Sequence, residues 1–369
     1  MKKTLFERRG KTAAAGRAGF AVLLAAALAF LGGACSKKEP AASAGAVSRA
    51  FVNGVLTEPY KLKVPDQMYF DFTIAKEKGF FEEVGIIKEN TGALPSGTTL
   101  VQTVVSGDND LMGSGHVTDV VNARNAGAKI KIVMQGHIDH PDLGKGHMYF
   151  YVRDDSPIKS GADFKGKKVA VVNRGTCSDL MLQEYLYQNN LTENDVEIVV
   201  MPDLQMLPAL KQGQVDVGAL HVLYAMNAVA EGGYRQIASS YEIGTAAAGG
   251  DTFGGDAFGT AVRAFSEDFI NKNPDVIKAY IAANLKAQRW SNANFDEASE
   301  IYAVTMELKN AGGNWFDPED LGVDERKVQF WLDMMVKHGW LEAGSVKASD
   351  LYTNDLNPYL NGELPEPAF

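Results

Sequence analysis

Two stretches of this 369-residue chain follow one plan, and they decide the fold. Residues 107–117 read GDNDLMGSGHV, and residues 213–222 read GQVDVGALHV. Each has a glycine, an aspartate three residues later, a short apolar run and then a His-Val pair. The apolar run predicts a buried strand, and the residues from His-Val onward predict a helix. We therefore expect two α/β units built on the same plan.

Strand and helix patterns alternate on either side of these stretches. The strands are predicted at residues 60–64, 86–87, 111–112, 130–134, 168–172, 196–201 and 215–220. The helices between them are predicted at residues 72–78, 117–125, 178–189 and 204–212. Such alternation predicts parallel sheets with crossover helices. Beyond about Ala264 only helices are expected, the first of them opening at Asn273-Pro274.

The first 34 residues have the composition of an export signal. Six basic residues lie between residues 2 and 17, and residues 19–34 are apolar and small. Cys35 follows directly, and this arrangement resembles a bacterial lipoprotein signal. It implies cleavage before Cys35, a lipid on its sulfur, and a protein body tethered outside the cytoplasmic membrane. Gly32 replaces the leucine usual in that signal, so an ordinary secretory signal with an incidental cysteine is the alternative.

Composition limits the classes of protein that fit the rest of the chain. Residues 35–57 read as a flexible tether, because Ala, Ser, Gly and Lys predominate there without periodicity. Without residues 1–34 the chain has 30 basic and 45 acidic residues, a net charge of −15, which argues against nucleic-acid binding. Cys177 is then the only cysteine besides Cys35, so no disulfide can form within one mature chain. A remainder of roughly 310 residues suggests two domains.

Five segments, in their order and spacing, resemble the solute-binding proteins of ABC transporters, in the nitrate/sulfonate/taurine-type (NMT1/THI5-like) branch. They are residues 75–86 (AKEKGFFEEVGI), 106–110 (SGDND), 163–169 (DFKGKKV), 212–216 (QGQVD) and 273–276 (NPDV). The resemblance covers roughly residues 60–362. It implies a two-lobed α/β fold of the periplasmic-binding-protein type II, with C-terminal helices packed on lobe I. Lobe I would comprise residues 58–155 and 256–369, lobe II would comprise residues 156–255, and the crossings would fall near residues 147–155 and 254–262.

The ligand site is expected where the lobes face each other. Ligands of α/β sheets bind beyond the carboxyl ends of strands, where helix N-termini present free N–H groups. At one such turn Arg174 could pair with a carboxylate or sulfonate, Gly175 allows close approach, and Thr176 could bond an oxyanion. The alternatives are a hydroxyl that only caps the helix and a solvated Arg174. The predicted ligand-binding residues are Tyr69, Phe70, Thr98, Ser114, His116, Arg174, Gly175, Thr176, Cys177, His221, Tyr224 and Phe253.

The aromatic members of this set follow from the resemblance, which places ligand contacts near Tyr69 and Phe70. For each of them a place in the hydrophobic core is the alternative. His116 and His221 occupy matched positions in the two units and could clamp an anion or ligate a metal. The alternative for either histidine is a hydrogen-bonded side chain at a helix start.

A third group of candidates is the stretch at residues 137–147, which contains three histidines and two aspartates. Such side chains could hold zinc or another divalent ion. Their spacing matches no zinc motif, so we predict a polar surface loop and assign no metal and no cofactor.

The function that these features predict is a non-enzymatic receptor that delivers a small solute to an ABC permease. A monomer on the periplasmic side, held to the membrane by a lipid, is expected. The turns favour an organic anion such as a sulfonate or carboxylate. The alternatives are a pyrimidine vitamin precursor, a metal or metal chelate, and an enzyme with Cys177 as nucleophile. The enzyme is disfavoured because neither His116 nor His221 is close to Cys177 in sequence to serve as a base.

Overall fold

The computed structural model describes residues 49–65, 69–92 and 97–367. The predicted signal at residues 1–34, the lipid site Cys35 and most of the predicted tether lie outside the described residues. These described residues form one compact unit. Within the described part of the chain, every helix is too short or too polar to cross a membrane.

The described chain begins with a small hairpin formed by β1 (Phe51–Val52) and β2 (Val55–Leu56). The side chain of Leu56 is 4% exposed. The end of the predicted tether at residues 35–57 is therefore ordered. Next, β3 (Tyr60–Val64) pairs in parallel with β4 (Ile86–Asn90), and α1 (Phe70–Glu77) and α2 (Phe80–Glu83) connect them. Gly79, at φ +76°, separates the two helices.

A three-stranded antiparallel sheet follows, with β12 (Val262–Ser266) between β5 (Leu111–Gly115) and β6 (Ile130–Gln135). The returning strand thus joins two strands that lie far before it in the sequence. The helices α3 (Gly97–Ser106) and α4 (Val117–Asn125) flank β5 in the sequence, and α10 (Glu267–Lys272) follows β12. Both edges of β12 are fixed in register at Val262, which is opposite Gly115 on one side and Gln135 on the other.

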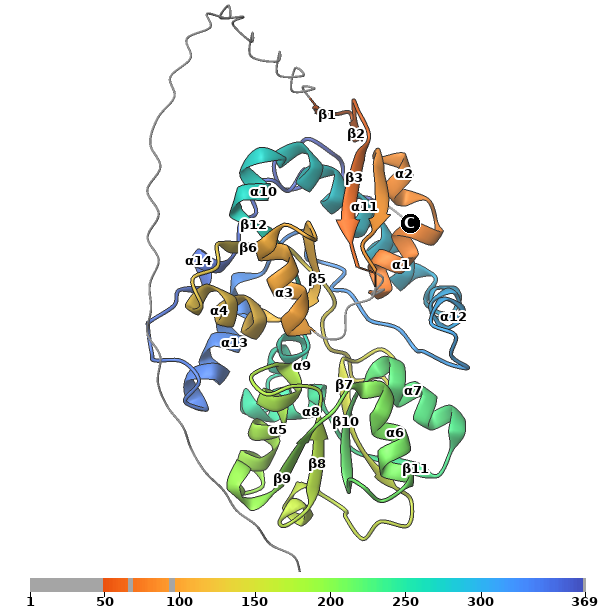
Figure 1. Ribbon diagram of the computed structural model, residues 1–369, viewed down its shortest axis with the longest axis vertical. Coiled ribbons are helices and arrows are strands. Elements are labelled where there is room, and N and C mark those ends of the chain that lie inside the picture. The colour runs from red at the N-terminus through yellow and green to blue at the C-terminus, as the bar shows by residue number, and fades with distance from the viewer. Residues whose placement is uncertain (1–48, 66–68, 93–96, 368–369) are drawn as a thin grey trace, which may run out of the picture. The chain divides into compact units, whose positions relative to one another are not determined.

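The later strands form a five-stranded sheet in the order β11-β7-β10-β8-β9 (Figure 1). Its strands are β7 (Met148–Arg153), β8 (Lys168–Val171), β9 (Glu197–Val200), β10 (Val217–His221) and β11 (Tyr234–Ser239). Its helices are α5 (Cys177–Gln188), α6 (Asp203–Lys211), α7 (Val222–Glu231), α8 (Ser240–Ala247) and α9 (Thr252–Phe258), with 3-10 turns η1 (Gly161–Phe164) and η2 (Glu193–Asp195).

The five-stranded sheet is mixed, in contrast to the all-parallel sheet expected from the alternation of strands and helices. β8 pairs in parallel with β9 and β10, whereas β7 pairs antiparallel with β10 and β11. β7 was expected as a crossing strand at the end of lobe I, but its pairing places it in this sheet. The chain therefore passes between the two sheets at residues 136–147, ahead of β7, and returns at residues 259–261, ahead of β12.

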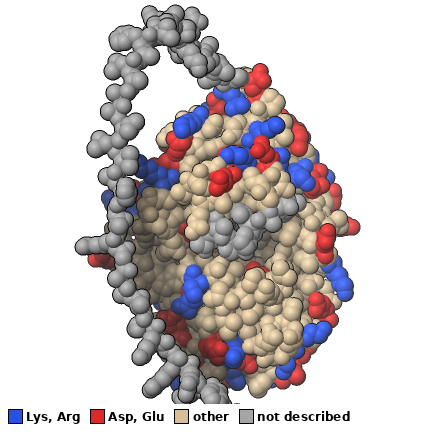
Figure 2. Space-filling model, viewed as in Figure 1, with Lys and Arg blue, Asp and Glu red and all other residues tan. Residues whose placement is uncertain are grey.

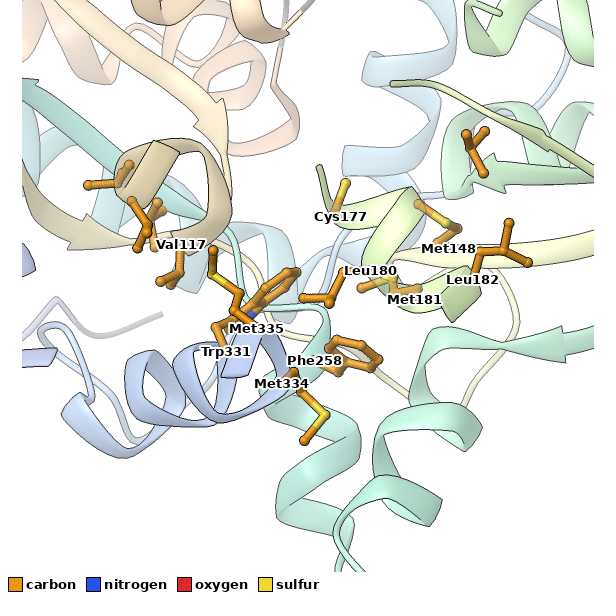
Figure 3. Close-up of a cluster of buried hydrophobic side chains, with 14 of the residues drawn as sticks. Val117, Met148, Cys177, Leu180, Met181, Leu182, Phe258, Trp331, Met334 and Met335 are labelled. Atoms are coloured by element: carbon orange, nitrogen blue, oxygen red, sulfur yellow. The ribbon is translucent and has the colours of Figure 1, made fainter. Parts of the chain in front are cut away.

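The C-terminal segment is helical, as predicted, and comprises α11 (Pro274–Ala293), α12 (Phe295–Thr305), α13 (Glu325–Lys337) and α14 (Ala348–Leu351). The long α11 packs on α1, α2 and β6. The helix α13 packs on α4, which follows β5, and also on α5 and α9, which flank the five-stranded sheet. In Figure 3, Trp331 of α13 meets Val117, Leu180 and Phe258 in one buried cluster.

Two buried ionic groups hold these parts together. Arg263 of β12 donates to Asp71 of α1 at 2.6 Å, and Gln288 of α11 donates to the other oxygen of the same carboxylate at 2.9 Å. Both members of the ion pair are buried, and a buried charge is tolerated when it is paired and hydrogen-bonded. Lys337 and His338, at the end of α13, donate to the buried carboxylate of Glu184 on α5.

Candidate functional site

Four of the six histidines and Cys177 come together between the three-stranded and five-stranded sheets. The ring centroids of His116 and His147 are 4.5 Å apart, and those of His147 and His221 are 4.9 Å apart. The ring of His137 lies 5.3 Å from that of His147. The sulfur of Cys177 lies 3.6 Å from Nε2 of His221. We call these five residues the His-Cys cluster.

The register of β12 brings His116 and His137 into the cluster. Because Val262 is paired with both Gly115 and Gln135, the residues that follow β5 and β6 lie on either side of the segment that precedes β12. Nδ1 of His116 lies 2.9 Å from the carbonyl oxygen of Thr260 in that segment. The carbonyl oxygen of His137 accepts a hydrogen bond from the backbone N–H of Ala261 at 2.8 Å.

The register of β7 and β10 brings in the other two histidines. His221, the last residue of β10, is opposite Met148, the first residue of β7, so His147 is next to it. The backbone N–H of His147 also donates to the buried carboxylate of Asp139 at 2.8 Å, which fixes the loop that carries it. The prediction of a polar surface loop at residues 137–147 is therefore wrong for His137, Asp139 and His147, which are all buried.

Cys177 enters the cluster as the first residue of α5, directly after the N-cap residue Thr176. Its side chain is buried, at 7% exposure. His221, which contacts the sulfur through Nε2, is held on its opposite side by Asp203, the first residue of α6, with Nδ1 2.8 Å from Oδ2. His221 is far from Cys177 in the sequence but lies next to it in the structure, because three different elements of the fold meet here.

The electrostatics of the cluster favour a thiolate beside a charged imidazole. Burial raises the pKa of the Cys177 thiol. His116 and His221 lower that pKa by more than burial raises it, and the net result is a pKa of about 7. Burial lowers the pKa of His221, but Asp203 and Cys177 hold it well above its ordinary value. For His137 and His147, burial first and the neighbouring charged histidines second keep the pKa well below the ordinary value.

At or next to the N-cap of three helices, a carboxylate of the protein itself accepts a hydrogen bond from one backbone N–H. The backbone N–H of His116 donates to Asp119 at 2.8 Å, and that of Gly175 donates to Asp179 at 2.8 Å. Asp203 likewise accepts from the backbone N–H of His221 at 3.3 Å. These carboxylates add negative charge around the cluster.

The structure brings some of the other predicted residues close to the cluster. Thr176 is buried, and its hydroxyl donates to the carbonyl of Asn173 at 3.1 Å. Gly175 has φ +74°, and its carbonyl oxygen accepts a hydrogen bond from the Asn122 side chain of α4 at 2.9 Å. Tyr224 is partly buried one turn after His221 on α7.

Other predicted residues are used elsewhere. The guanidinium of Arg174 forms ion pairs with Asp179 and Glu193 of its own lobe. Phe70 is 1% exposed and packs against Phe295, Tyr302 and Phe316, as in the alternative that placed it in the core.

Two further aromatic candidates have neighbours of their own. The ring of Tyr69 packs on Gly113 and faces the guanidinium of Arg263. Phe253 lies under Arg326 of α13. The side chains of Thr98 and Ser114 lie outside the described part of the structure.

Comparison with known proteins assigns the chain to a family. The NMT1/THI5-like family model matches residues 69–298, and the chain belongs to this family. A putative binding protein of Brucella abortus is 26% identical over 295 residues, covering 76% of this chain and 85% of its own. A putative aliphatic sulfonates-binding protein of Escherichia coli is 26% identical over 214 residues, covering 58% of this chain and 61% of its own.

A solved structure shows the same architecture. The periplasmic nitrate-binding protein NrtA of Synechocystis superposes with a TM-score of 0.63 at 17% sequence identity, covering 84% of this chain and 90% of that chain. The predicted family and the predicted α/β fold of the periplasmic-binding-protein type are therefore confirmed. On the face shown in Figure 2, acidic and basic side chains are interspersed and form no single basic patch.

Proposed function

We propose that this protein is the solute-binding receptor of an ABC importer and holds a small solute between its two lobes. The observation that carries the proposal is the convergence of His116, Cys177 and His221 from both sheets at the ends of their strands. In α/β sheets this is the edge at which ligands bind. Members of the family and relatives named for binding support the same role.

Contacts between the lobes describe how a solute would be enclosed. Asn122 of α4 donates to the carbonyl of Gly175 at 2.9 Å, and Lys337 and His338 at the end of α13 hold Glu184 of α5. Opening of the lobes breaks these contacts, and closure restores them. A solute that bridges the lobes therefore shifts the population toward the closed form, in the manner of hinge closure.

The proposed solute is a small organic anion. His116 and His221 both have a raised pKa, because Cys177 and the nearby carboxylates outweigh the effect of burial, so they can present positive charge to the solute. A sulfonate or carboxylate fits such a pair, and a relative is named for aliphatic sulfonates. A pyrimidine remains the alternative organic solute.

The same proposal includes the cellular setting. A lipid on Cys35 would tether the receptor on the periplasmic side of the membrane. A monomer there would present the closed lobes to a permease. The net charge of −15 without residues 1–34 supports a partner other than nucleic acid.

A thermal-shift screen over sulfonates, carboxylates and pyrimidines, with a chelator present, tests the receptor role. A solute that binds only the folded state raises the melting temperature with its concentration. The His221→Gln variant should lose this shift, whereas His140→Gln, a histidine outside the cluster, should keep it. A screen in which no organic solute shifts the wild-type protein would contradict the receptor proposal.

One observation favours a second candidate, an enzyme with Cys177 as nucleophile. Cys177, His221 and Asp203 lie in series at 3.6 Å and 2.8 Å, as a nucleophile, a base and its orienting carboxylate do. Cys177→Ser separates the two candidates. A receptor keeps its affinity for the solute in this variant, whereas an enzyme keeps binding but loses conversion of the solute, measured by mass spectrometry of the bound compound.

A further inference from the structure

We infer that the His-Cys cluster binds a zinc-class divalent metal ion through His116, His147 and Cys177, with His221 as the fourth ligand. One ligand atom from each of the first three residues lies within 4.8 Å of the other two. The inference rests on the proposed function, because the two lobes that close on a solute also bring these ligands together. It names the metal ion as an occupant of that same site.

The hydrogen bonds of the cluster direct the correct nitrogen of two rings toward the centre. The carbonyl of Thr260 can only accept, so Nδ1 of His116 carries the proton of that 2.9 Å hydrogen bond. The carboxylate of Asp203 fixes the proton on Nδ1 of His221 in the same way. In the neutral ring, the lone pair is then on Nε2, the atom that in His221 faces the sulfur of Cys177.

One ring nitrogen of His147 gives independent evidence for a ligand, because it is buried without a hydrogen-bond partner among the described residues. Its Nδ1 lies 3.2 Å from Nε2 of His137, so one ring nitrogen is satisfied. Within the described part of the structure, its Nε2 is buried and has no hydrogen-bond partner. A buried nitrogen without a partner carries a desolvation cost, and a metal ion bound to that nitrogen removes it.

The distances are compatible with coordination after a small contraction. Tetrahedral zinc has bonds of about 2.0–2.1 Å to nitrogen and about 2.3 Å to sulfur, which sets its ligand atoms roughly 3.3–3.7 Å apart. The 3.6 Å between Cys177 and His221 already lies in that range. The 4.8 Å limit that applies to His116, His147 and Cys177 leaves a contraction of about 1 Å, and the two lobes that carry them can supply it.

The surroundings of the cluster match those of a metal site. Ligating histidines usually donate their second ring nitrogen to a carbonyl or carboxylate, as His116 does to Thr260 and His221 does to Asp203. A divalent ion with one thiolate and neutral imidazoles has a net charge of about +1. The carboxylates of Asp119 and Asp203 offset this charge. The partly exposed side chain of His221, at 26%, offers the ion a way in.

Other roles for the cluster use fewer of its parts. A nucleophile needs only Cys177, His221 and Asp203, and it leaves His147 unexplained. An anion clamp uses His116 and His221 and likewise leaves unexplained the Nε2 of His147, which has no partner in the described chain. A metal ion uses all of these groups, because binding displaces the protons from the thiol and the imidazoles.

Cobalt(II) titration of the chelator-treated, purified chain tests this inference. Cobalt replaces zinc in tetrahedral sites and gives strong visible bands there, with a charge-transfer band when a thiolate is a ligand. We expect one equivalent to bind with both features, and zinc to bleach them. Cys177→Ser should lose the charge-transfer band, and His147→Gln should weaken binding at least about tenfold. His140→Gln, from the same loop, should bind as the wild type does.

The outcomes separate this inference from the receptor role. Bands that are absent in the wild type, or unchanged in Cys177→Ser and His147→Gln, overturn the metal site. Circular dichroism of each variant confirms that its fold is intact. The solute screen with chelator present tests the receptor role independently of the metal site. A solute that raises the melting temperature in that screen, in a protein that does not bind cobalt, overturns only the metal site. Cobalt binding without any solute shift contradicts the receptor proposal and supports the metal site.

Discussion

Asp203 holds Nδ1 of His221 at 2.8 Å, and the opposite nitrogen of that ring lies 3.6 Å from the sulfur of Cys177. The carboxylate comes from the start of α6, the imidazole from the end of β10 and the thiol from the start of α5. One carboxylate therefore sets both the tautomer and the orientation of a ring that reaches the centre of the cluster. The role of this carboxylate can be tested without changing any group that touches the ligand.

Asp203→Asn should weaken cobalt binding roughly 10- to 100-fold, which is typical when the carboxylate behind a ligating histidine is removed. It should also slow alkylation of Cys177 by iodoacetamide, because the amide no longer stabilises the charged imidazole beside the thiolate. Asp216→Asn is the control, since Asp216 precedes the same strand and bonds only the backbone N–H of Lys168 in the described structure. Equal affinity and equal alkylation rates in the two variants would contradict the role of Asp203.

Glu184→Gln should loosen the contact between α5 and the end of α13. Burial raises the pKa of Glu184, but hydrogen bonds from His338, Lys337 and Gln188 hold the net pKa below its ordinary value. The amide presents one acceptor oxygen instead of two and no charge to Lys337, so we expect a loss of about 1–3 kcal/mol in urea denaturation. Small-angle scattering should also show a larger radius of gyration. Glu193→Gln, at an exposed ion pair, should change stability by less than about 1 kcal/mol.

Asp71→Asn should be among the most destabilising single changes in the chain. It leaves the guanidinium of Arg263 buried at 2% exposure without its counter-charge, and loss of one partner of such a pair costs about 3–5 kcal/mol. Chemical denaturation measures the change. Asp155→Asn is the matched control because its partner Arg153 is 43% exposed, so a loss of similar size there would argue against burial as the cause.

Asp256→Asn should stabilise the protein at neutral pH and have no effect in acid. Burial, followed by the nearby carboxylates of Asp317 and Asp251, raises the pKa of Asp256 to about 6 despite Lys327. Because this value is above that of the unfolded chain, the group costs stability as the pH rises from about 4 to 6. The difference in melting temperature between variant and wild type should therefore be near zero at pH 4 and positive at pH 7.5.

If the Asp256→Asn variant and the wild type have the same melting temperature at both pH values, the pKa of Asp256 in the folded protein has its ordinary value, and the prediction is wrong. Asp108→Asn gives the baseline, because Asp108 lies on an exposed turn and bonds only Ser106 in the described structure.

Much of the fold is visible in local sequence patterns, but the site depends on register. The paired stretches that contain His116 and His221 predicted two strands that each lead into a helix, and both are present. The spacing of apolar residues also predicted α1, α4 and β8 close to their observed bounds. These features arise within a few residues and need no knowledge of distant partners.

The roles of His137 and His147 could not be read in the same way. Their burial follows from the pairing of β12 with β6 and of β10 with β7, which joins residues far apart in the sequence. The density of histidines at residues 137–147 was the available signal. This segment lies directly between two apolar strands, and that position was a sign of burial that the prediction of a surface loop did not use. Asp203 gave no signal of its own, because an aspartate at a helix start is ordinary.

Trp331 stacks on the ring of His116, with centroids 5.0 Å apart and an interplanar angle of 28°, and its indole N–H donates to the carbonyl of Ala257. The indole is fully buried, so solvent does not govern its fluorescence. An imidazole that gains a proton or a cation quenches the fluorescence of a neighbouring indole more strongly than a neutral imidazole does. Trp331, one of four tryptophans in the chain, is thus an intrinsic fluorescent reporter whose emission responds to events at the His116 ring without an attached dye.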